Sequence, residues 1–234
     1  MDLREVSGNR NRHPWELSRT DSILRILDRL HIGGAVLDIG CGDSYFDAKL
    51  VERFPDIVVY GVDINLTEEL HEDRLHAVTS LSHLPDSKFD CILMMDVLEH
   101  IENDAEYLSG ILSRLQPDGT VLITVPAFMR LYSLHDRELL HYRRYEHRSL
   151  RQVLDKSGLK EIRWSYFYFS LVLGRLLTMN QTKNLSGWDH PDSALSTRLV
   201  RAVLNADFRV LLFLSRIGIR LPGLSLLSVC KRAS

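Results

Sequence analysis

The chain has 234 residues, and its 29 basic and 31 acidic side chains leave a formal net charge of −2 at pH 7. This length suits one α/β domain with an elaboration rather than two full domains. The near-neutral balance, without an arginine-rich face, excludes the electrostatic footprint of a nucleic-acid-binding protein. The three cysteines are far apart in apolar runs, which predicts reduced, buried thiols and neither a disulfide framework nor a zinc site (Cys41, Cys91 and Cys230).

The beginning of the chain is polar and charged, without the pattern of a secretory signal peptide. No apolar stretch has the length of a membrane-spanning helix. We therefore expect a cytoplasmic protein. Residues 1–31 are predicted to form an N-terminal arm and a helix, and residues 32–234 the main domain. Trp15 and Arg19, near the start of the helix, either fold over a ligand site or belong to a surface helix.

The most informative segment is the apolar run 35–39, which contains Asp38 and leads into Gly40, Cys41 and Gly42. Such a run predicts a buried parallel strand. The two glycines after it predict a tight turn whose backbone N–H groups lie open to a ligand.

A second apolar run, 57–62, ends at Asp63, where a carboxylate can accept hydrogen bonds from the two hydroxyls of a ribose. Dinucleotide sites use a third glycine in the first turn, and here Tyr45 stands in its place. Asp43 adds negative charge where a pyrophosphate needs positive potential. These features favour a cationic cofactor without phosphate, and S-adenosylmethionine fits that description.

The remaining pattern alternates strands with helices, which is typical of an open parallel sheet covered on both faces. We predict an α/β fold with a Rossmann-like, seven-stranded, mostly parallel sheet whose last strand is antiparallel. Residues 127–148 are expected to form a lid over the site, and residues 165–220 a helical, substrate-covering elaboration. The predicted strands are 35–39, 57–62, 75–78, 89–95, 120–125, 159–169 and 224–230, and the predicted helices of the core are 44–54, 66–72, 102–115 and 149–156.

Four ordered segments, 36–42, 61–63, 89–100 and 115–123, resemble the motifs of class I S-adenosylmethionine-dependent methyltransferases. The resemblance implies S-adenosylmethionine as cofactor. This chain has no acid before the Leu84-Pro85 pair, so backbone groups near Ser80 and Leu81 are expected to meet the adenine. The cofactor-binding residues are then Asp38, Gly40, Cys41, Gly42, Asp63, Ile64, Ser80, Leu81 and Met95.

Methyl transfer to a hydroxyl or an acidic carbon needs a base, and three histidines are candidates: His100, His135 and His141. An equally open interpretation is that Glu99 and His100 cap or orient the next helix. Metal binding is not predicted, because no acid–histidine spacing typical of a metal-binding helix is present.

The run from His135-Asp136 to His141 and the triplet Arg143, Arg144 and Tyr145 resembles one subgroup of bacterial methyltransferases. We predict that the triplet binds a carboxylate or phosphate on the substrate, because paired arginines suit bidentate contacts. The alternative is that the arginines hold the lid shut by pairing with acids of the same segment (Asp136, Glu138 and Glu146).

The apolar stretches 166–177 and 210–214 leave two interpretations open. One is a substrate tunnel or a shallow membrane contact, with Arg175, Arg209 and Arg216 near lipid headgroups. The other is a cap over the core or a homodimer face.

The predicted function is methyl transfer from S-adenosylmethionine to a small organic acceptor, at oxygen first, with carbon or nitrogen as alternatives. An apolar or lipid-linked acceptor is left open. A nicotinamide-dependent oxidoreductase and a non-catalytic cofactor-binding protein are the rival classes. Nucleic-acid methylation is disfavoured, because residues 96–99 lack an Asn-Pro-Pro-aromatic signature. The expected partner is a small molecule, and a peripheral membrane contact and a homodimer stay open.

Overall fold

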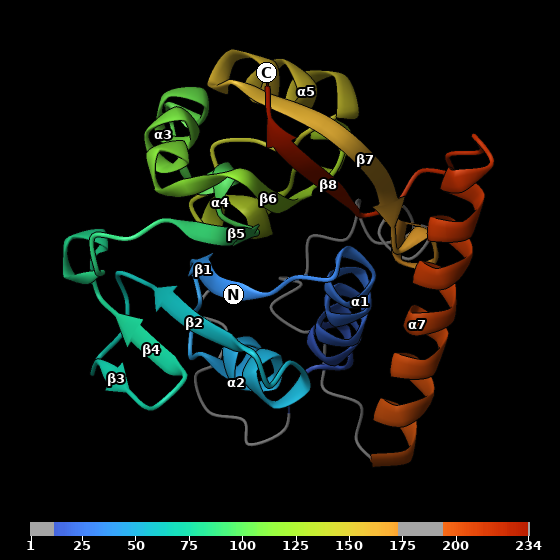
Figure 1. Cartoon of the computed structure of the whole chain (residues 1–234). Coiled ribbons are helices and arrows are strands. Elements are labelled where there is room, and N and C mark those ends of the chain that lie inside the picture. Colours follow the sequence, from blue (N-terminus) through green and yellow to red (C-terminus); the bar gives the residue numbers. More distant parts are fainter. Residues whose placement is uncertain (1–11, 173–193, 234) are drawn as a thin grey trace.

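The computed structural model describes residues 12–172 and 194–233, and Figure 1 shows a twisted sheet with helices on both of its faces. The strands are β1 Gly34–Ile39, β2 Ile57–Val62, β3 Leu70–His71, β4 Leu75–Val78, β5 Phe89–Met95, β6 Leu115–Pro126, β7 Leu159–Phe167 and β8 Ser225–Arg232. They lie in the order β3-β4-β2-β1-β5-β6-β8-β7.

The centre of the sheet is parallel, as the continuous apolar runs predict. Val36 of β1 pairs with Val59 of β2 on one side and with Cys91 of β5 on the other. All three side chains are fully buried, which is the environment that an apolar run without polar alternation requires. The carboxyl ends of β1, β2 and β5 therefore meet at one edge of the sheet, where ligands of open α/β sheets bind.

The far end of the sheet is antiparallel. β8 lies between β6 and β7 and runs antiparallel to both, which confirms the predicted antiparallel last strand. The sheet has eight strands rather than seven, because β3 adds a two-residue antiparallel edge to β4. The helix predicted over 66–72 is wrong: Leu70 instead pairs with Ala77 across the β3–β4 hairpin.

Two helices, α3 and α5, pack on one face of the sheet, and α1, α2 and α7 pack on the other. Short 3₁₀ turns connect several elements. The helices are α1 Pro14–Leu30, α2 Tyr45–Arg53, α3 Asp104–Ile111, α4 Leu134–Glu138, α5 His147–Ser157 and α7 Ala194–Arg216, and the turns are η2 Leu81–His83, η3 Leu98–His100, η4 Leu112–Arg114 and η5 Met129–Leu131.

Helix α1 begins with a capped first turn. His13 is the N-cap and accepts a hydrogen bond from the backbone N–H of Trp15, and Pro14 occupies the first helical position. Ile23 and Ile26 of its apolar face are fully buried. The arm predicted before this helix lies largely in residues 1–11, outside the described residues.

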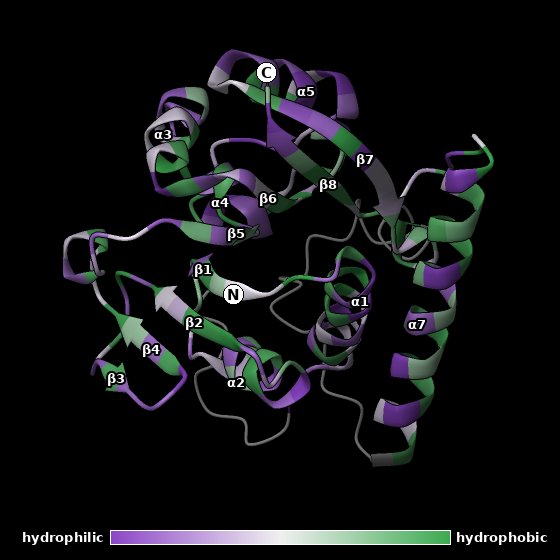
Figure 2. Ribbon diagram, viewed as in Figure 1, coloured by the Kyte–Doolittle hydropathy of each residue, from purple (hydrophilic) through white to green (hydrophobic). Residues whose placement is uncertain are grey.

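Helix α7 carries a long apolar row on its exposed side. Leu204, Phe208 and Leu211 pack into the core, whereas Leu199 and Phe213 are 65% and 61% exposed. Green bands consequently alternate with purple along the outer helix in Figure 2. Residues 173–193, including Arg175, lie outside the described residues, and no described helix is long and apolar enough to cross a bilayer.

Candidate active site

The turn after β1 has the conformation that its glycines permit. Gly40 and Gly42 have φ angles of +76° and +61°, in the left-handed region that glycine adopts without strain. A Cβ atom at Gly40 would lie 2.5 Å from Cγ2 of Val97, so the turn packs closely on the segment after β5. The Gly40 N–H donates to the carbonyl of Val62 at 2.8 Å, which ties the turn to the end of β2.

Asp63 sits at the tip of β2 beside this turn. Its Oδ2 accepts a hydrogen bond from the Gly42 N–H at 2.9 Å, and its Oδ1 accepts one from the Asn65 N–H at 2.8 Å. Ile64, the next residue, is 84% exposed, so its side chain is accessible to a flat ligand. The arrangement is compatible with a ribose whose hydroxyls donate hydrogen bonds to Asp63 and with an adenine that packs against Ile64.

The structure pairs Asp38 with an acid that the sequence interpretation missed, Asp47 of α2. Burial raises the pKa of Asp38 to about 6 and raises the pKa of Asp47 well above its ordinary value. The two carboxyls also interact electrostatically with each other. The two carboxyls share a hydrogen bond when Asp47 holds its proton, and neither has another partner among the described residues. This buried acid pair below the turn suits a cationic ligand group, and Cys41 is buried beside it.

The start of α1 folds over the strand tips. Arg19 is 6% exposed and forms an ion pair with Asp96, the residue that follows β5. Asp96 has a φ angle of +57°, an uncommon conformation for a residue with a side chain. Arg12 similarly bridges α1 to Asp43 of the glycine turn. These contacts favour the interpretation in which this helix covers the ligand site.

The residues after β4 form the region that the sequence predicts to bind the adenine. The carbonyl of Leu81 accepts a hydrogen bond from Arg114 at 3.2 Å, and the hydroxyl of Ser80 accepts one from the Ser82 N–H at 3.3 Å. An acid from the β3–β4 hairpin lies beside this region: Glu69 accepts a hydrogen bond from the Thr79 N–H at 3.1 Å. Hydrogen bonds, first of all from His83, lower the pKa of Glu69 to about 2. Met95 is buried at the tip of β5.

Two of the three candidate histidines come together. The rings of His100 and His141 lie 4.7 Å apart at an angle of 82°. Nδ1 of His141 is 3.1 Å from Oδ1 of Asp136, and Nε of Arg144 donates to the same oxygen at 2.7 Å. Although burial acts to raise the pKa of Asp136, these contacts hold it below its ordinary value. His135 precedes Asp136 on α4.

Glu99 and the two neighbouring histidines form a candidate metal-binding group. One ligand atom from each of Glu99, His100 and His141 lies within 4.8 Å of the others. The Glu99 carboxyl is fully buried without a hydrogen-bond partner among the described residues, and burial raises its pKa well above the ordinary value. Nitrogen and oxygen ligands of this kind can hold a divalent cation. The sequence spacing did not predict the group, because its members lie on η3 and on the distant lid.

The predicted substrate-binding triplet is engaged by the protein itself. Arg143 donates to Asp104 at 2.9 Å, and the Tyr145 hydroxyl donates to the same carboxylate at 2.8 Å. Arg144 pairs with Asp136, one of the acids named in the alternative interpretation. The Arg143 and Tyr145 contacts tie the lid to α3, and the Arg144 contact joins two parts of the lid. They support the lid-holding role, while substrate binding by the triplet stays a prediction.

The fold and the glycine turn define a class I methyltransferase-like α/β protein. The family model described as "Methyltransferase domain" matches residues 10–165, and the chain belongs to this family. A probable S-adenosylmethionine-dependent methyltransferase of Mycolicibacterium smegmatis is 24% identical over 67% of this chain and 63% of its own length. S-adenosylmethionine is accordingly the cofactor, and the buried acid Asp38 and the glycine turn are compatible with its cationic end.

Solved structures share the fold across nearly the whole chain. The methyltransferase in the Trm112 complex of Haloferax volcanii has a TM-score of 0.59 at 17% identity, covering 94% of this chain and 91% of its own. The N-methyltransferase NodS of Bradyrhizobium japonicum, bound to S-adenosylhomocysteine, has a TM-score of 0.58 at 14% identity, covering 99% and 96%.

The curated relatives match over shorter segments. An uncharacterized methyltransferase of Mycobacterium tuberculosis is 30% identical over 38% of this chain and 48% of the relative, so the match spans about half of that relative's length. The mitochondrial ubiquinone biosynthesis O-methyltransferase of Arabidopsis thaliana is 30% identical over 42% of this chain and 34% of the relative.

Proposed function

We propose that this chain transfers the methyl group of S-adenosylmethionine to a hydroxyl oxygen of a small organic acceptor, with His141 as general base. The observation that carries the proposal is the Asp136–His141 pair, joined to the segment that packs on the glycine turn. The Tyr142 N–H donates to the Glu99 carbonyl at 2.8 Å, and Val97 of the same segment contacts Gly40. The base and the cofactor turn thus share one edge of the sheet.

The pair has the arrangement that a general base needs. With the His141 proton on Nδ1 and donated to the Asp136 carboxylate, Nε2 is the basic atom. Arg144 and the Ser133 N–H hold the carboxylate in place, so the imidazole keeps one orientation. His141 would take the acceptor's hydroxyl proton while the new oxygen–carbon bond forms in line with the breaking carbon–sulfur bond.

Other residues of the chain bind the cofactor and shield the reacting groups from water. Bound S-adenosylmethionine supplies an electrophilic methyl on a sulfonium and leaves as the neutral thioether. We assign the ribose hydroxyls to Asp63, the base to Ile64 and the cationic amino-acid end to the region of Asp38. Arg19 and Trp15, on the helix that covers the strand tips, exclude water from the reacting groups.

Oxygen is favoured over nitrogen or carbon for two reasons. An oriented base is needed by a neutral hydroxyl and not by a free amine. Several relatives that match about two fifths of the chain are named ubiquinone biosynthesis O-methyltransferases. An apolar or lipid-linked acceptor and a cytoplasmic location are part of the same proposal.

The test is methylation of an acceptor panel by the full chain, with stoichiometric S-adenosylhomocysteine measured by mass spectrometry. The panel contains phenols, alcohols, carboxylic acids and amines. Phenol methylation that His141→Gln abolishes supports the proposal, and amine methylation that survives this substitution moves the acceptor atom to nitrogen. A chain that binds the cofactor yet methylates no panel member contradicts the proposal. The fold alone does not ensure methyl transfer, since a [4+2]-cyclase, SpnF, shares it with a TM-score of 0.54.

The same assay decides between a base and a metal centre. If His141 is the base, activity survives treatment with EDTA, because no step uses a cation. Loss of activity on chelation, with recovery on adding Mg²⁺, Mn²⁺ or Zn²⁺, would reassign Glu99, His100 and His141 to a metal site.

A further inference from the structure

The outer face of α7 has an unusual composition. Every exposed position of this helix from residue 195 to 216 is either apolar or arginine. Leu195, Leu199 and Phe213 are 77%, 65% and 61% exposed, so large apolar side chains face outward along the whole helix. We define the outer face of α7 as its exposed apolar residues together with its exposed arginines: Leu195, Arg198, Leu199, Ala202, Val203, Ala206, Arg209, Val210, Phe213 and Arg216.

The inner face of α7 fixes the helix on the protein. Arg201 makes two hydrogen bonds to Asp21 of α1, at 2.8 and 2.7 Å. Asp207, the acid of this helix, accepts hydrogen bonds from the Phe169 and Ser170 N–H groups at 3.2 and 2.7 Å. The outer face therefore cannot be buried by rotating the helix, and it has no acid of its own.

The three arginines of the outer face lie along one border of the apolar row. Arg198, Arg209 and Arg216 are separated by 11 and 7 residues, spacings that return to the same side of an α-helix. None of the three forms an ion pair with an acid among the described residues. An apolar row bordered by cations is the pattern of a helix that lies in the plane of a membrane interface.

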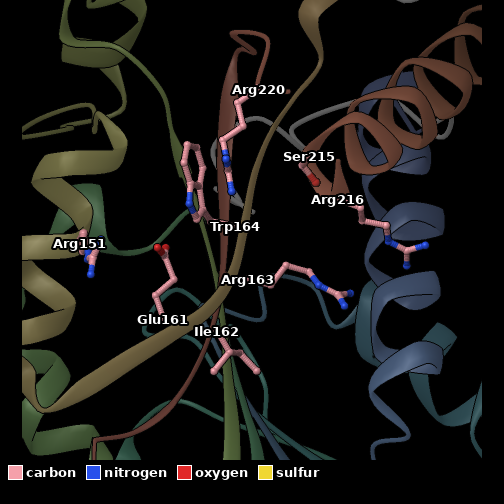
Figure 3. A pocket seen from close by; sticks show the side chains of 8 residues that line it. All are labelled: Arg151, Glu161, Ile162, Arg163, Trp164, Ser215, Arg216 and Arg220. Carbon is pink, nitrogen blue, oxygen red and sulfur yellow. The ribbon is translucent and has the colours of Figure 1, made fainter. Parts of the chain in front are cut away.

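A basic pocket continues this surface at the end of α7. The pocket has a volume of about 310 Å³ and lies between β7, α5 and the end of α7. Figure 3 shows four arginine side chains around it: Arg151, Arg163, Arg216 and Arg220. Its one acid, Glu161, is held by His147 at 2.7 Å and by the Ser228 hydroxyl at 2.5 Å. Arg151 also pairs with Asp155 of its own helix at 3.9 Å. The arginines still outnumber the acids around the pocket, so it presents net positive charge, which suits a phosphate group.

We propose that the outer face of α7 and this pocket dock the protein on a membrane that contains anionic phospholipid, with α7 parallel to the surface. The apolar row enters the interface, and the arginines of the helix and pocket bind lipid phosphates. Ile217, Ile219 and Leu221, exposed just after the helix, extend the apolar contact toward the pocket.

Charge favours a membrane over a second copy of the chain. A symmetric dimer through the outer face would bring the arginines of both copies together, and this face offers no exposed acid to pair with them. An anionic bilayer supplies the apolar phase and the negative charge at once. The docking does not rest on methyl transfer, although α7 packs on α1, the helix whose Arg19 reaches the strand tips.

The test is sedimentation of the full chain with vesicles of phosphatidylcholine, with and without phosphatidylglycerol. We expect clear binding only with the anionic lipid, and weaker binding as salt increases. Arg198→Gln/Arg209→Gln/Arg216→Gln should lower the partition coefficient by about 100-fold, at about fivefold per charge. Leu199→Ser/Phe213→Ser should lower it by about tenfold or more. Arg53→Gln/Arg148→Gln, which removes exposed arginines elsewhere, should bind like the unchanged protein.

Each contrary result has a distinct meaning. Equal binding to both vesicles, or equal losses in the control variant, would overturn the proposal. Failure to bind vesicles while Leu199→Ser/Phe213→Ser converts a dimer to a monomer in analytical ultracentrifugation would assign the face to a second copy. Calorimetric binding of inorganic phosphate without vesicle binding would make the pocket a site for a soluble phosphate compound. S-adenosylhomocysteine affinity, measured for every variant, shows that each is folded and keeps this test separate from that of methyl transfer.

Discussion

At the scale of single residues, the site depends on carboxyl groups whose surroundings differ sharply. Asp63 is held by backbone N–H donors at a strand tip, whereas Asp38 is fully buried beside a second acid, Asp47, and accepts no backbone hydrogen bond among the described residues. Backbone donors stabilise a carboxylate, and burial without donors favours its protonated form. The two acids are therefore tested by different experiments: Asp63 by ligand affinity and Asp38 by stability.

Replacing Asp63 by alanine should weaken cofactor binding by about 1–3 kcal/mol, the cost of losing a charged hydrogen-bond acceptor. Isothermal titration with S-adenosylhomocysteine measures the change. Asp63→Asn, which can still accept from the Gly42 N–H, separates loss of charge from collapse of the turn. Asp73→Ala, an exposed acid of a neighbouring loop, is the matched control. Unchanged affinity in Asp63→Ala would remove the ribose assignment.

Asp38 should make the cofactor-free protein less stable as pH rises. Its folded-state pKa of about 6 lies above the ordinary value of 3.8, so the folded protein holds the proton more tightly than the unfolded chain does. The contribution to stability is complete below pH 4 and is lost as pH rises to about 6, by roughly 3 kcal/mol at most.

Urea unfolding of the unchanged protein and Asp38→Asn, at pH 4.5 and at pH 7, measures this effect by difference. The asparagine resembles the protonated acid, so the variant should gain stability relative to the unchanged protein at the higher pH. A difference between the two proteins that is the same at both pH values would contradict the raised pKa.

At the scale of elements, the lid is held by polar contacts rather than by a core of its own. Tyr132 donates to the His141 carbonyl at 2.7 Å, and Arg143 reaches across to Asp104 of α3. Asp136 joins α4 to the segment that follows it, residues 139–146, through Arg144 and His141. Such a network holds His141 over the strand tips with one orientation.

Asp136→Asn should lower kcat for a phenol acceptor by about 10²- to 10⁴-fold, because an amide can stabilise the wrong tautomer of His141. The affinity for S-adenosylhomocysteine should not change. A phenol acidic enough to be ionised at the assay pH should be affected much less, since it needs no base. Glu138→Gln, on the exposed side of the same helix, is the control. Equal losses with both kinds of phenol would show that Asp136 acts only through the lid's structure.

At the scale of the whole molecule, α7 is attached mainly through α1 and β7. Leu204 and Phe208 bury against the same core as Ile23 and Ile26. The Arg201–Asp21 ion pair joins the two helices, with side chains 40% and 25% exposed. The sheet thereby carries an outer helix that does not contribute to the cofactor turn.

The Arg201–Asp21 pair should stabilise the protein only modestly. Solvent screening of its exposed side reduces the coupling to about 0.5–1 kcal/mol, even with two parallel hydrogen bonds. A double-mutant cycle of Arg201→Ala and Asp21→Ala, read by urea unfolding, measures it. A coupling near zero would mean that apolar packing alone holds α7 in place.

The sequence by itself determined the parallel core and the position of the cofactor turn. Buried parallel strands need continuous apolar runs, and the turn needs glycines, so β1, β2 and β5 and the pair Gly40 and Gly42 are encoded locally. Their acids follow because the carboxyl ends of neighbouring parallel strands meet at one edge. This reasoning reached Asp38 and Asp63 but not Asp47 or Glu69, whose places depend on how a helix and a hairpin pack.

Only the tertiary structure decided which distant side chains pair with each other and which side of α7 faces the core. Asp136 contacts both His141 and Arg144. Glu99 lies near His141 because the lid packs against η3. Helix α7 is apolar on two sides, so helical periodicity could not choose which side enters the core. Packing of Leu204 and Phe208 made that choice and left Leu199 and Phe213 facing outward. Local patterns encode strands and turns, whereas the contacts between them depend on the packed chain.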